Sequence, residues 1–349
     1  MGAFLFGYKK DMLSGILFVA IFAIAATYIS TLSFIKTLGF SPLVIGIVLG
    51  MIYANTISSK TPKHFQSGIT FSAKKILRFA IVLYGFRLTF QEIINVGLEG
   101  FLAAAIMLTT TLLLGSYVGV KFFKMDRDGA ILTASGASVC GAAAVLATEP
   151  VLKAEESKVA IAVSMVVLFG TISMFLYPIM YEGFIKNANG FLHMSPREFG
   201  IYVGSTVHEV AQVVAIPAST TNAPEVMANS AVIVKMTRVL LIAPMLIALG
   251  IFLSLSSNNS AKTKLTIPWF AIYFILVIGF NSLNIVPKNI VEYINIFDTF
   301  LLTMAMSALG MGTVFSKFKG IGANAFYTAL TMFAWLVVGG FIVTKLITA

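Results

Sequence analysis

Residues 133–144 read TASGASVCGAAA, a run of small and hydroxyl side chains inside an apolar stretch. A helix is weakly held there, because glycine costs about 1 kcal/mol relative to alanine and serine competes for backbone hydrogen bonds. A break inside a membrane survives only where it lines a polar cavity, and the N-terminus of a half-helix attracts anions. The run therefore predicts a broken, glycine-rich helix with an anion site, while close helix packing through small residues remains the alternative.

The surrounding chain has the composition of a membrane protein. Of its 349 residues, 58% are hydrophobic and 11% are charged, whereas soluble domains carry roughly 25% charged residues. At about 20 apolar residues per span, we predict an all-α polytopic membrane protein with about eleven transmembrane helices in a single transporter domain, residues 1–349. The expected spans are 12–33, 42–57, 76–91, 98–120, 129–148, 158–181, 198–217, 227–255, 268–285, 289–314 and 322–346.

The basic residues predict the orientation of these spans. With a cytoplasmic N-terminus, sixteen Lys and Arg residues lie in inside segments, among them Lys186 and Arg197, and five lie outside. The outside residues are Lys36, Lys153, Lys158, Lys288 and Lys345. The net charge is +10, but the Lys and Arg residues lie between apolar runs instead of clustering on one face. We therefore expect the lipid bilayer as a partner and no nucleic acid.

An internal repeat links two parts of the chain. Shifting the sequence by 225 residues aligns 77–118 with 302–343 and gives ten identities in 42 positions. In the eleven-span count the third span runs outward and the tenth runs inward. The pair therefore predicts an inverted repeat, a feature of secondary transporters.

The seventh span holds ionisable residues where they are expensive. Residues 204–212 read GSTVHEVAQ, and on a helix Ser205, Gln212 and the edges of His208 and Glu209 share one face. An ionisable residue in a span is a functional hypothesis by default, so His208 and Glu209 are candidates for proton coupling; a buried network that holds helices together is the alternative. The second histidine of a zinc-protease motif is missing, and we expect no metal and no cofactor.

The eighth span places two cations on one helix face, Lys235 and Arg238. Two cations repel each other unless an anion lies between them, and that anion is either a protein carboxylate such as Glu209 or a substrate oxyanion, which suits the planar fork of arginine. Arg87, near the outer end of the third span, is expected to be an interfacial or packing residue.

Four stretches carry a family resemblance. Residues 135–150, 167–178, 205–215 and 83–88 resemble the YeiH-like family of bacterial sulfate exporters, over nearly the whole chain. The resemblance implies an inner-membrane protein that exports sulfate or a related sulfur oxyanion. More distantly, spans three to six look like the bile-acid:sodium symporter fold, in which two broken helices cross at the substrate site.

That fold requires the two crossing elements to be antiparallel, whereas the fifth and seventh spans run in the same direction in the eleven-span count. The second broken element is therefore expected either as a re-entrant piece within 181–195 or as the tenth span, around Ser307, Gly310 and Gly312.

Together these features predict a secondary transporter, an exporter of a small anion such as sulfate, that works by alternating access coupled to protons. No phosphate-binding loop occurs, so we expect no ATPase activity of its own. The predicted substrate-binding residues are Ser135, Gly136, Ser138 and Gly141 as backbone donors, Lys235 and Arg238 for charge, and Ser205 and Gln212. A sodium-coupled organic-anion symporter, an intramembrane enzyme and a non-transporting scaffold are the alternatives, with an enzyme not expected; homo-oligomerisation is left open.

Overall fold

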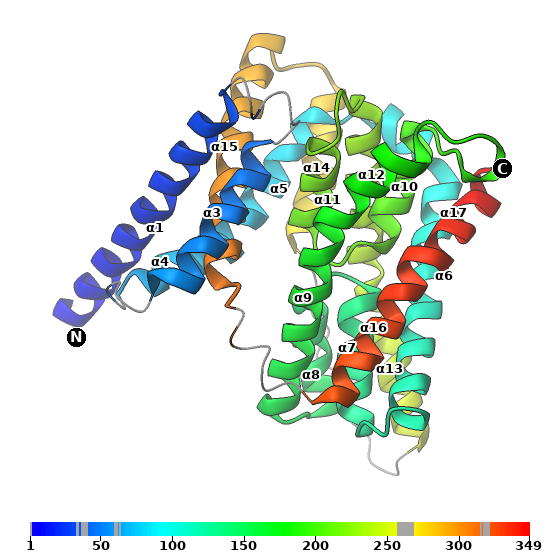
Figure 1. Ribbon diagram of the computed structural model, residues 1–349. Coiled ribbons are helices and arrows are strands. Elements are labelled where there is room, and N and C mark those ends of the chain that lie inside the picture. Colours follow the sequence, from blue (N-terminus) through cyan, green and yellow to red (C-terminus); the bar gives the residue numbers. More distant parts are fainter. Residues whose placement is uncertain are drawn as a thin grey trace. The chain divides into compact units, whose positions relative to one another are not determined.

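The structure, a computed structural model, describes residues 2–32, 35, 41–58, 62, 64–256, 269–314, 316 and 322–349. Every regular element in these ranges is a helix (Figure 1). The chain divides into two compact units. Unit 1 comprises Met1–Phe90, Ala218–Asn222 and Ile272–Ser316, and unit 2 comprises Gln91–Pro217, Ala223–Ala271 and Lys317–Ala349. Both units combine distant segments, so no linker marks the boundary, and the single transporter domain stays a prediction.

The helices of unit 1 are α1 (Gly2–Ser30), α3 (Pro42–Thr56), α4 (Phe65–Phe71), α5 (Leu77–Tyr84), most of α14 (Trp269–Ser282) and α15 (Lys288–Gly312). Those of unit 2 are α6 (Phe90–Lys121), α7 (Arg127–Ser138), α8 (Ala142–Leu152), α9 (Glu156–Met180), α10 (Pro196–Thr206), α11 (Val210–Ala218), α12 (Glu225–Leu240), α13 (Ile242–Ser256), α16 (Ala323–Ala334) and α17 (Gly340–Thr348).

Six helical stretches of the described chain are long and apolar enough to cross a membrane. They are Asp11–Ser30, Phe90–Lys121, Ser157–Ile185, Glu225–Leu253, Lys288–Gly312 and Ala323–Thr348. Each overlaps a predicted span, so the expected helical, polytopic architecture is confirmed. Three shorter apolar helices, Pro42–Thr56, Ala142–Leu152 and Ile272–Ser282, fall below the length of a full crossing.

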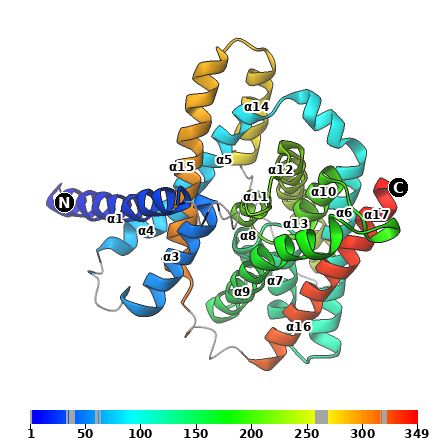
Figure 2. The ribbon, with the colours of Figure 1, turned by 45° about the horizontal axis from the view of Figure 1, so that its top comes forward.

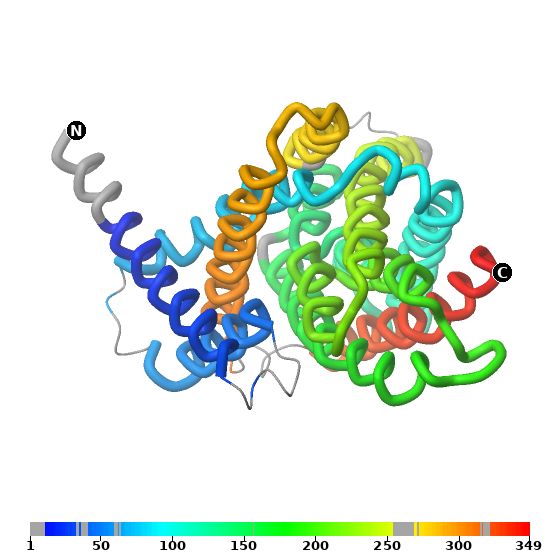
Figure 3. The backbone as a smooth tube through the Cα atoms, turned by 90° about the horizontal axis from the view of Figure 1, so that it is seen from above, coloured from blue at the N-terminus to red at the C-terminus, as the bar shows by residue number. Residues whose placement is uncertain are grey.

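Within unit 1, α15 packs against α1, α3 and α5, as the tube in Figure 3 shows for the orange and blue segments. Glycines allow α3 to approach α15 closely: a side chain at Gly46 would place its Cβ 2.7 Å from Ser307 Oγ, and one at Gly50 would meet the Ser307 carbonyl. α15 is continuous through Ser307 and Gly310. The suggestion that the tenth span is a second broken helix is therefore wrong.

Within unit 2, α6 lies beside α16 and α17 and runs against them (Figures 1 and 2). The indole of Trp335 donates to Thr110 Oγ1 at 3.2 Å, and Gly119, further along α6, packs on Thr328, earlier in α16. Gly97 kinks α6 with φ +55°, which glycine tolerates. The antiparallel pair is compatible with the aligned segments 77–118 and 302–343, and the inverted repeat stays a prediction.

The predicted break lies at residues 139–141, between α7 and α8. Val139 ends α7 with φ −118° and ψ −87°, and Gly141 has φ +77°. The chain then reverses, because the Lys158 ammonium at the start of α9 lies 2.8 Å from the Asp126 carboxylate that caps α7. Had α8 continued in the direction of α7, these ends would be roughly 35–40 Å apart. α7 and α8 therefore form a re-entrant pair, hairpin A.

A second break, at residues 207–209, separates α10 from α11, and Val207 is extended there. α10 runs parallel to α12, because a Cβ at Gly200 would lie 2.9 Å from Ser230 and one at Gly204 2.8 Å from Val234. Since α10 and α12 start at the same end of unit 2, α11 must carry the chain back to that end. α10 and α11 form hairpin B.

The two hairpins enter unit 2 from opposite ends, as Figure 1 shows for α7 and α8 against α10 and α11. α9 starts beside hairpin A and ends beside hairpin B. Its Tyr177 ring stacks on Tyr202 at 4.9 Å between centroids, and its Tyr181 ring lies 4.3 Å from Phe199, so α9 and α10 are antiparallel.

These contacts correct the eleven-span count in three ways. The predicted spans 129–148 and 198–217 do not cross unit 2; each enters and returns. Their first halves, α7 and α10, run in opposite directions instead of the same direction. The second break lies inside the predicted seventh helix, and the described residues of 181–195 contain a short π-turn and a 3-10 turn instead of a re-entrant piece.

Candidate functional site

The ends of the two hairpins meet inside unit 2. We name residues 137–143 tip A and residues 206–210 tip B. A side chain at Gly141 in tip A would place its Cβ 2.7 Å from Cγ of Glu209 in tip B. Each tip joins the C-terminus of one half-helix to the N-terminus of the next. Such ends leave backbone carbonyls and N–H groups without partners in the helix, so a buried tip needs polar groups from elsewhere.

Lys235 supplies three of these groups. Its side chain is completely buried. The ammonium donates to the carbonyl of Val139 in tip A at 2.6 Å and to the carbonyls of Val207 and His208 in tip B, both at 2.7 Å. An ammonium has three donors, so the protein backbone uses all of them.

Arg238 repeats the pattern three residues later on α12, and it too is completely buried. Its Nε and Nη2 donate to the Ser138 carbonyl at 3.0 and 2.5 Å, and Nη2 also donates to the Ala137 carbonyl at 3.0 Å. Nη1 donates to the Val207 carbonyl in tip B at 3.3 Å. Both cations therefore join tip A to tip B.

Helix ends place partial charges beside the two cations. A helix C-terminus carries about half a negative charge, and the C-termini of α7 and α10 both face the two cations. The side chain of Gln212 accepts from the Glu209 N–H at 3.1 Å at the start of α11. A side chain at Gly170 would collide with this amide, with its Cβ 2.5 Å from Gln212 Nε2. Gln212 thus caps hairpin B from within.

The predicted donors of tip A are already in use. The hydroxyls of Ser135 and Ser138, and that of Ser205 in hairpin B, donate to carbonyls three residues earlier at 2.8, 3.1 and 3.1 Å. The Gly141 N–H donates to the Gly136 carbonyl at 3.0 Å. A side chain at Gly136 would place its Cβ 2.6 Å from Val166 Cγ2, so Gly136 packs directly on Val166. These residues have partners inside the protein, and their contact with a substrate stays a prediction.

The sequence predicted a half-helix N-terminus in this run, but Ala142 and Ala143, the first residues of α8, were not among the predicted site residues. Ala142 is partly accessible and Ala143 is exposed, unlike the rest of tip A, and the first N–H groups of a helix lack partners in that helix. The signal was a glycine followed by three alanines. The Glu209 carboxylate lies next to the Ala142 N–H, and Glu209 is itself partly accessible.

His208 precedes Glu209 in tip B. It is 3% exposed, and its Nδ1 has no hydrogen-bond partner among the described residues. Behind it, the Tyr177 hydroxyl donates to Thr206 Oγ1 at 3.0 Å, and the Thr206 hydroxyl donates to the Tyr202 carbonyl at 2.6 Å. Sequence reasoning also missed this tyrosine pair, because its members lie on different helices.

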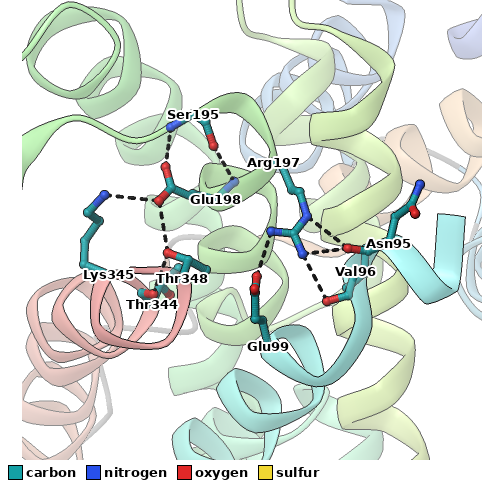
Figure 4. A network of polar contacts seen from close by, with 9 residues as sticks. All are labelled: Asn95, Val96, Glu99, Ser195, Arg197, Glu198, Thr344, Lys345 and Thr348. Carbon is teal, nitrogen blue, oxygen red and sulfur yellow. Dashed lines mark hydrogen bonds and ion pairs between the residues drawn. The ribbon is translucent and has the colours of Figure 1, made fainter.

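A polar network anchors the entrance of hairpin B (Figure 4). Ser195 and Glu198 form a capping box at the start of α10. Glu198 accepts from the Lys345 ammonium at 3.1 Å and from the Thr348 hydroxyl at 3.0 Å, which ties α10 to α17. Arg197 donates to Glu99 on α6 at 2.7 Å. These contacts fix hairpin B between two flanking helices.

Both hairpin entrances are hollowed. A cavity of about 350 Å³ at the entrance of hairpin A is lined by residues that include Lys124, Asp126 and Lys158. One of about 210 Å³ at the entrance of hairpin B is lined by residues that include Arg197 and Glu225. Within the part of the chain that the structure describes, no three His, Cys, Asp or Glu side chains gather as metal ligands would.

The chain matches the family described as Conserved hypothetical protein 698 over residues 14–329. It is 45% identical over 342 residues to a UPF0324 membrane protein of Bacteroides thetaiotaomicron, across 97% of this chain and 99% of the relative. It is 48% identical over 304 residues to the UPF0324 inner membrane protein YeiH of Escherichia coli K12, across 86% of this chain and 84% of the relative. These names state a membrane location and no substrate.

Proposed function

The chain belongs to the Conserved hypothetical protein 698 family of UPF0324 membrane proteins, and from this premise we propose that it is a secondary transporter of a small anion in the bacterial inner membrane. The predicted resemblance to YeiH-like proteins is confirmed at the level of the family. Sulfate and the likeness to bile-acid symporters come from the sequence resemblance alone.

The observation that carries the proposal is the meeting of tips A and B around Lys235 and Arg238. Discontinuous helices near the middle of the membrane are where secondary transporters build substrate sites, and non-helical backbone at that depth needs a polar surrounding. Because the hairpins enter unit 2 from opposite ends, their tips meet between the two ends, and the site can be reached from either end by a short path. Alternating access needs that placement.

The charge of the tips favours an anion. Lys235 and Arg238 contribute two positive charges, and Glu209 contributes one negative charge when ionised. The helix ends cancel, because two C-termini and two N-termini each contribute about half a charge. About one positive charge remains in a buried site, where an unpaired charge is costly. A small oxyanion at the start of α8 would offset this positive charge, and sulfate or a related sulfur oxyanion is the substrate that we propose.

Coupling is assigned to protons through His208 and Glu209. Both lie in tip B, and histidine is the side chain whose ordinary titration falls nearest to neutral pH. Lys235 and Arg238 act through their charge and through the backbone that they hold. Gln212 positions hairpin B through its bond to the Glu209 N–H, and a substrate contact of Ser205 and Gln212 stays a prediction.

The test is counterflow in proteoliposomes. The purified protein is reconstituted, and exchange of labelled sulfate, sulfite, taurine and dicarboxylates is measured at two pH values. Saturable exchange of at least one anion is expected, faster when an inward or outward proton gradient is imposed. Absence of saturable flux for the whole panel contradicts the proposed function.

A matched pair of variants locates the site. Lys288, at the start of α15, is exposed, so Lys288→Met removes one positive charge outside the tips and should leave exchange within about twofold of wild type. Glu209→Gln keeps the shape of the tip side chain and should change the pH dependence of exchange. Equal behaviour of the two variants would exclude the tips as the coupling site.

The alternative, a sodium-coupled organic-anion symporter, is separated by replacing sodium with choline in the same assay. Loss of exchange in choline would favour it over proton coupling. An intramembrane enzyme is set aside because the tips present no nucleophile paired with a base: the Cys140 thiol is buried, and the serine hydroxyls of the tips donate to their own helices.

A further inference from the structure

Glu209 belongs to tip B, but its carboxylate serves tip A. A Cβ at Gly141 would lie 2.7 Å from Glu209 Cγ and 3.1 Å from Oε1, so the carboxylate lies next to the Ala142 N–H at the start of α8. A side chain at position 141 would collide with the Glu209 side chain, and glycine avoids this collision. The start of α8, where an anion binds most readily, is already occupied by an anionic group of the protein itself.

This carboxylate differs from the cations around it in being replaceable. Lys235 and Arg238 are completely buried, and each bonds to carbonyls of both tips. Glu209 is partly accessible. Ala143, which follows Ala142 at the start of α8, is exposed. An ion that reaches the start of α8 therefore meets Glu209 before it meets any other charged group of the tips.

The remaining titratable neighbours come from each element packed against the tips. They are Cys140 in tip A, His208 in tip B, Lys235 and Arg238 on α12, and Tyr177 on α9. His208 adds an independent observation, because its buried Nδ1 has no partner among the described residues. A buried polar atom without a partner is costly, and an oxyanion or a carboxylic acid next to it would satisfy it.

We propose that the substrate anion and the Glu209 carboxylate occupy the start of α8 in turn, and that Glu209 leaves this position as the neutral acid. Glu209 takes one proton from water, its charge changes from −1 to 0, and the anion accepts the freed N–H of Ala142. This inference rests on the proposed transport function and names its coupling step: one proton is bound with each anion.

The charge of the site then selects the substrate class. With Glu209 neutral, Lys235 and Arg238 leave two positive charges, since the helix ends still cancel. A dianion balances them completely, whereas a monoanion leaves one unpaired charge in a buried site. The substrate class is therefore a small dianionic oxyanion, such as sulfate, carried together with one proton.

The test is calorimetric titration of the full-length protein in detergent with inorganic sulfate at about pH 7. Two buffers with different ionisation enthalpies report the protons taken up per anion. Wild type should take up close to one proton. Glu209→Gln, which retains an oxygen for the Ala142 N–H, should bind sulfate without proton uptake and with an affinity that is constant between about pH 6 and 8.

Glu182→Gln is the matched control. Glu182 pairs with Lys186 at 3.2 Å, away from the tips, so this variant should take up protons as wild type does. Sulfate binding by wild type without proton uptake overturns the inference and leaves the transport function standing, and so does unchanged uptake in Glu209→Gln. If neither sulfate nor any other anion of the counterflow panel binds or exchanges, the transport function falls and the inference falls with it.

Discussion

Both units place cations in apolar surroundings, on α12 in unit 2 and at the end of a short 3-10 turn in unit 1, and these cations bind different partners. In unit 2, Lys235 and Arg238 bond only to backbone carbonyls at the broken ends of α7 and α10. In unit 1, Arg87 bonds to a carboxylate, with Nη2 3.2 Å from Asp298 Oδ2 on α15. The Asp298 side chain is completely buried, while that of Arg87 is 30% exposed.

The difference shows what each cation is for. A side-chain pair such as Arg87 and Asp298 can be lost as a unit, because removing both members leaves no charge behind. The Asn295 carbonyl, which Arg87 also binds at 2.7 Å, keeps its bond from the Thr299 hydroxyl. Backbone acceptors cannot be removed by substitution, so the tips depend on Lys235 and Arg238 wherever hairpins A and B are broken. Arg87 was expected to be an interfacial or packing residue. It forms an ion pair with Asp298 that links the third and tenth predicted spans, and the sequence around neither residue predicts this pair.

The largest effect is expected at tip A and tip B. Lys235→Met removes a donor from three buried carbonyls. The Val207 carbonyl keeps its bond from Arg238, while those of Val139 and His208 lose the Lys235 ammonium, and each orphaned acceptor costs about 1–3 kcal/mol. We expect a loss of several kcal/mol, seen as low folded yield and a lower melting temperature in detergent. Lys288→Met, at an exposed position, should melt as wild type does. An unchanged melting temperature for Lys235→Met would remove the structural role of the cation.

A smaller and reversible effect is expected in unit 1. Arg87→Met leaves Asp298 buried without its cation, at a cost of about 3 kcal/mol, the lower end for breaking a buried pair because Arg87 is partly exposed. Adding Asp298→Leu should recover most of the lost melting temperature, since no charge is then left unpaired. A double variant as unstable as the single one would erase the contrast with the tips.

The smallest effect is expected for the partly exposed ion pair of Asp126 and Lys158 at the entrance of hairpin A. Burial alone would raise the pKa of Asp126, but hydrogen bonds from Lys158 and from the Gly129 N–H outweigh it and leave that pKa below its ordinary value. The carboxylate is therefore stabilising above its unfolded pKa, and this stability is lost as the pH falls through the folded pKa.

Because the Asp126 side chain is 49% exposed, Asp126→Asn should cost at most about 1 kcal/mol at neutral pH. The difference in melting temperature between wild type and variant should shrink as the pH is lowered from about 7 to about 3. A difference in melting temperature that grows on acidification would contradict a lowered pKa of Asp126 in the folded protein.

Composition and local pattern were enough to predict the helical membrane fold, the break beside Gly141 and the importance of Lys235 and Arg238. These are properties of short segments: glycine and serine weaken one helix, and two cations three residues apart share one face. The acceptors of those cations could not be predicted, because backbone carbonyls are present in every residue and only the break makes them available.

The second break carried a weaker signal. Tip B has no glycine between residues 206 and 210, and its polar pattern also fits a continuous amphipathic helix. The break is held by the Lys235 ammonium, which is 28 residues from Val207, and by the Gln212 side chain, which caps the start of α11. The Arg87–Asp298 pair was equally hidden, because 211 residues separate its members.

The reversal of the hairpins was invisible to the count of basic residues. Turning two crossing spans into hairpins moves Lys153 and Lys158 to the inside and Lys186 and Arg197 to the outside. Two basic residues move in each direction, so both topologies have sixteen basic residues inside and five outside. The positive-inside rule therefore supports a cytoplasmic N-terminus in either case and does not distinguish the two.

The most direct test of re-entrant hairpins is the accessibility of single cysteines to a membrane-impermeant thiol reagent. In a Cys140→Ala background, cysteine replaces one of three exposed residues, Lys124 before α7, Glu155 after α8 or Asn189 after α9. The hairpin fold predicts that positions 124 and 155 react from the same side of the membrane and position 189 from the other. Reaction of 124 and 189 from one side, with 155 on the opposite side, would contradict it.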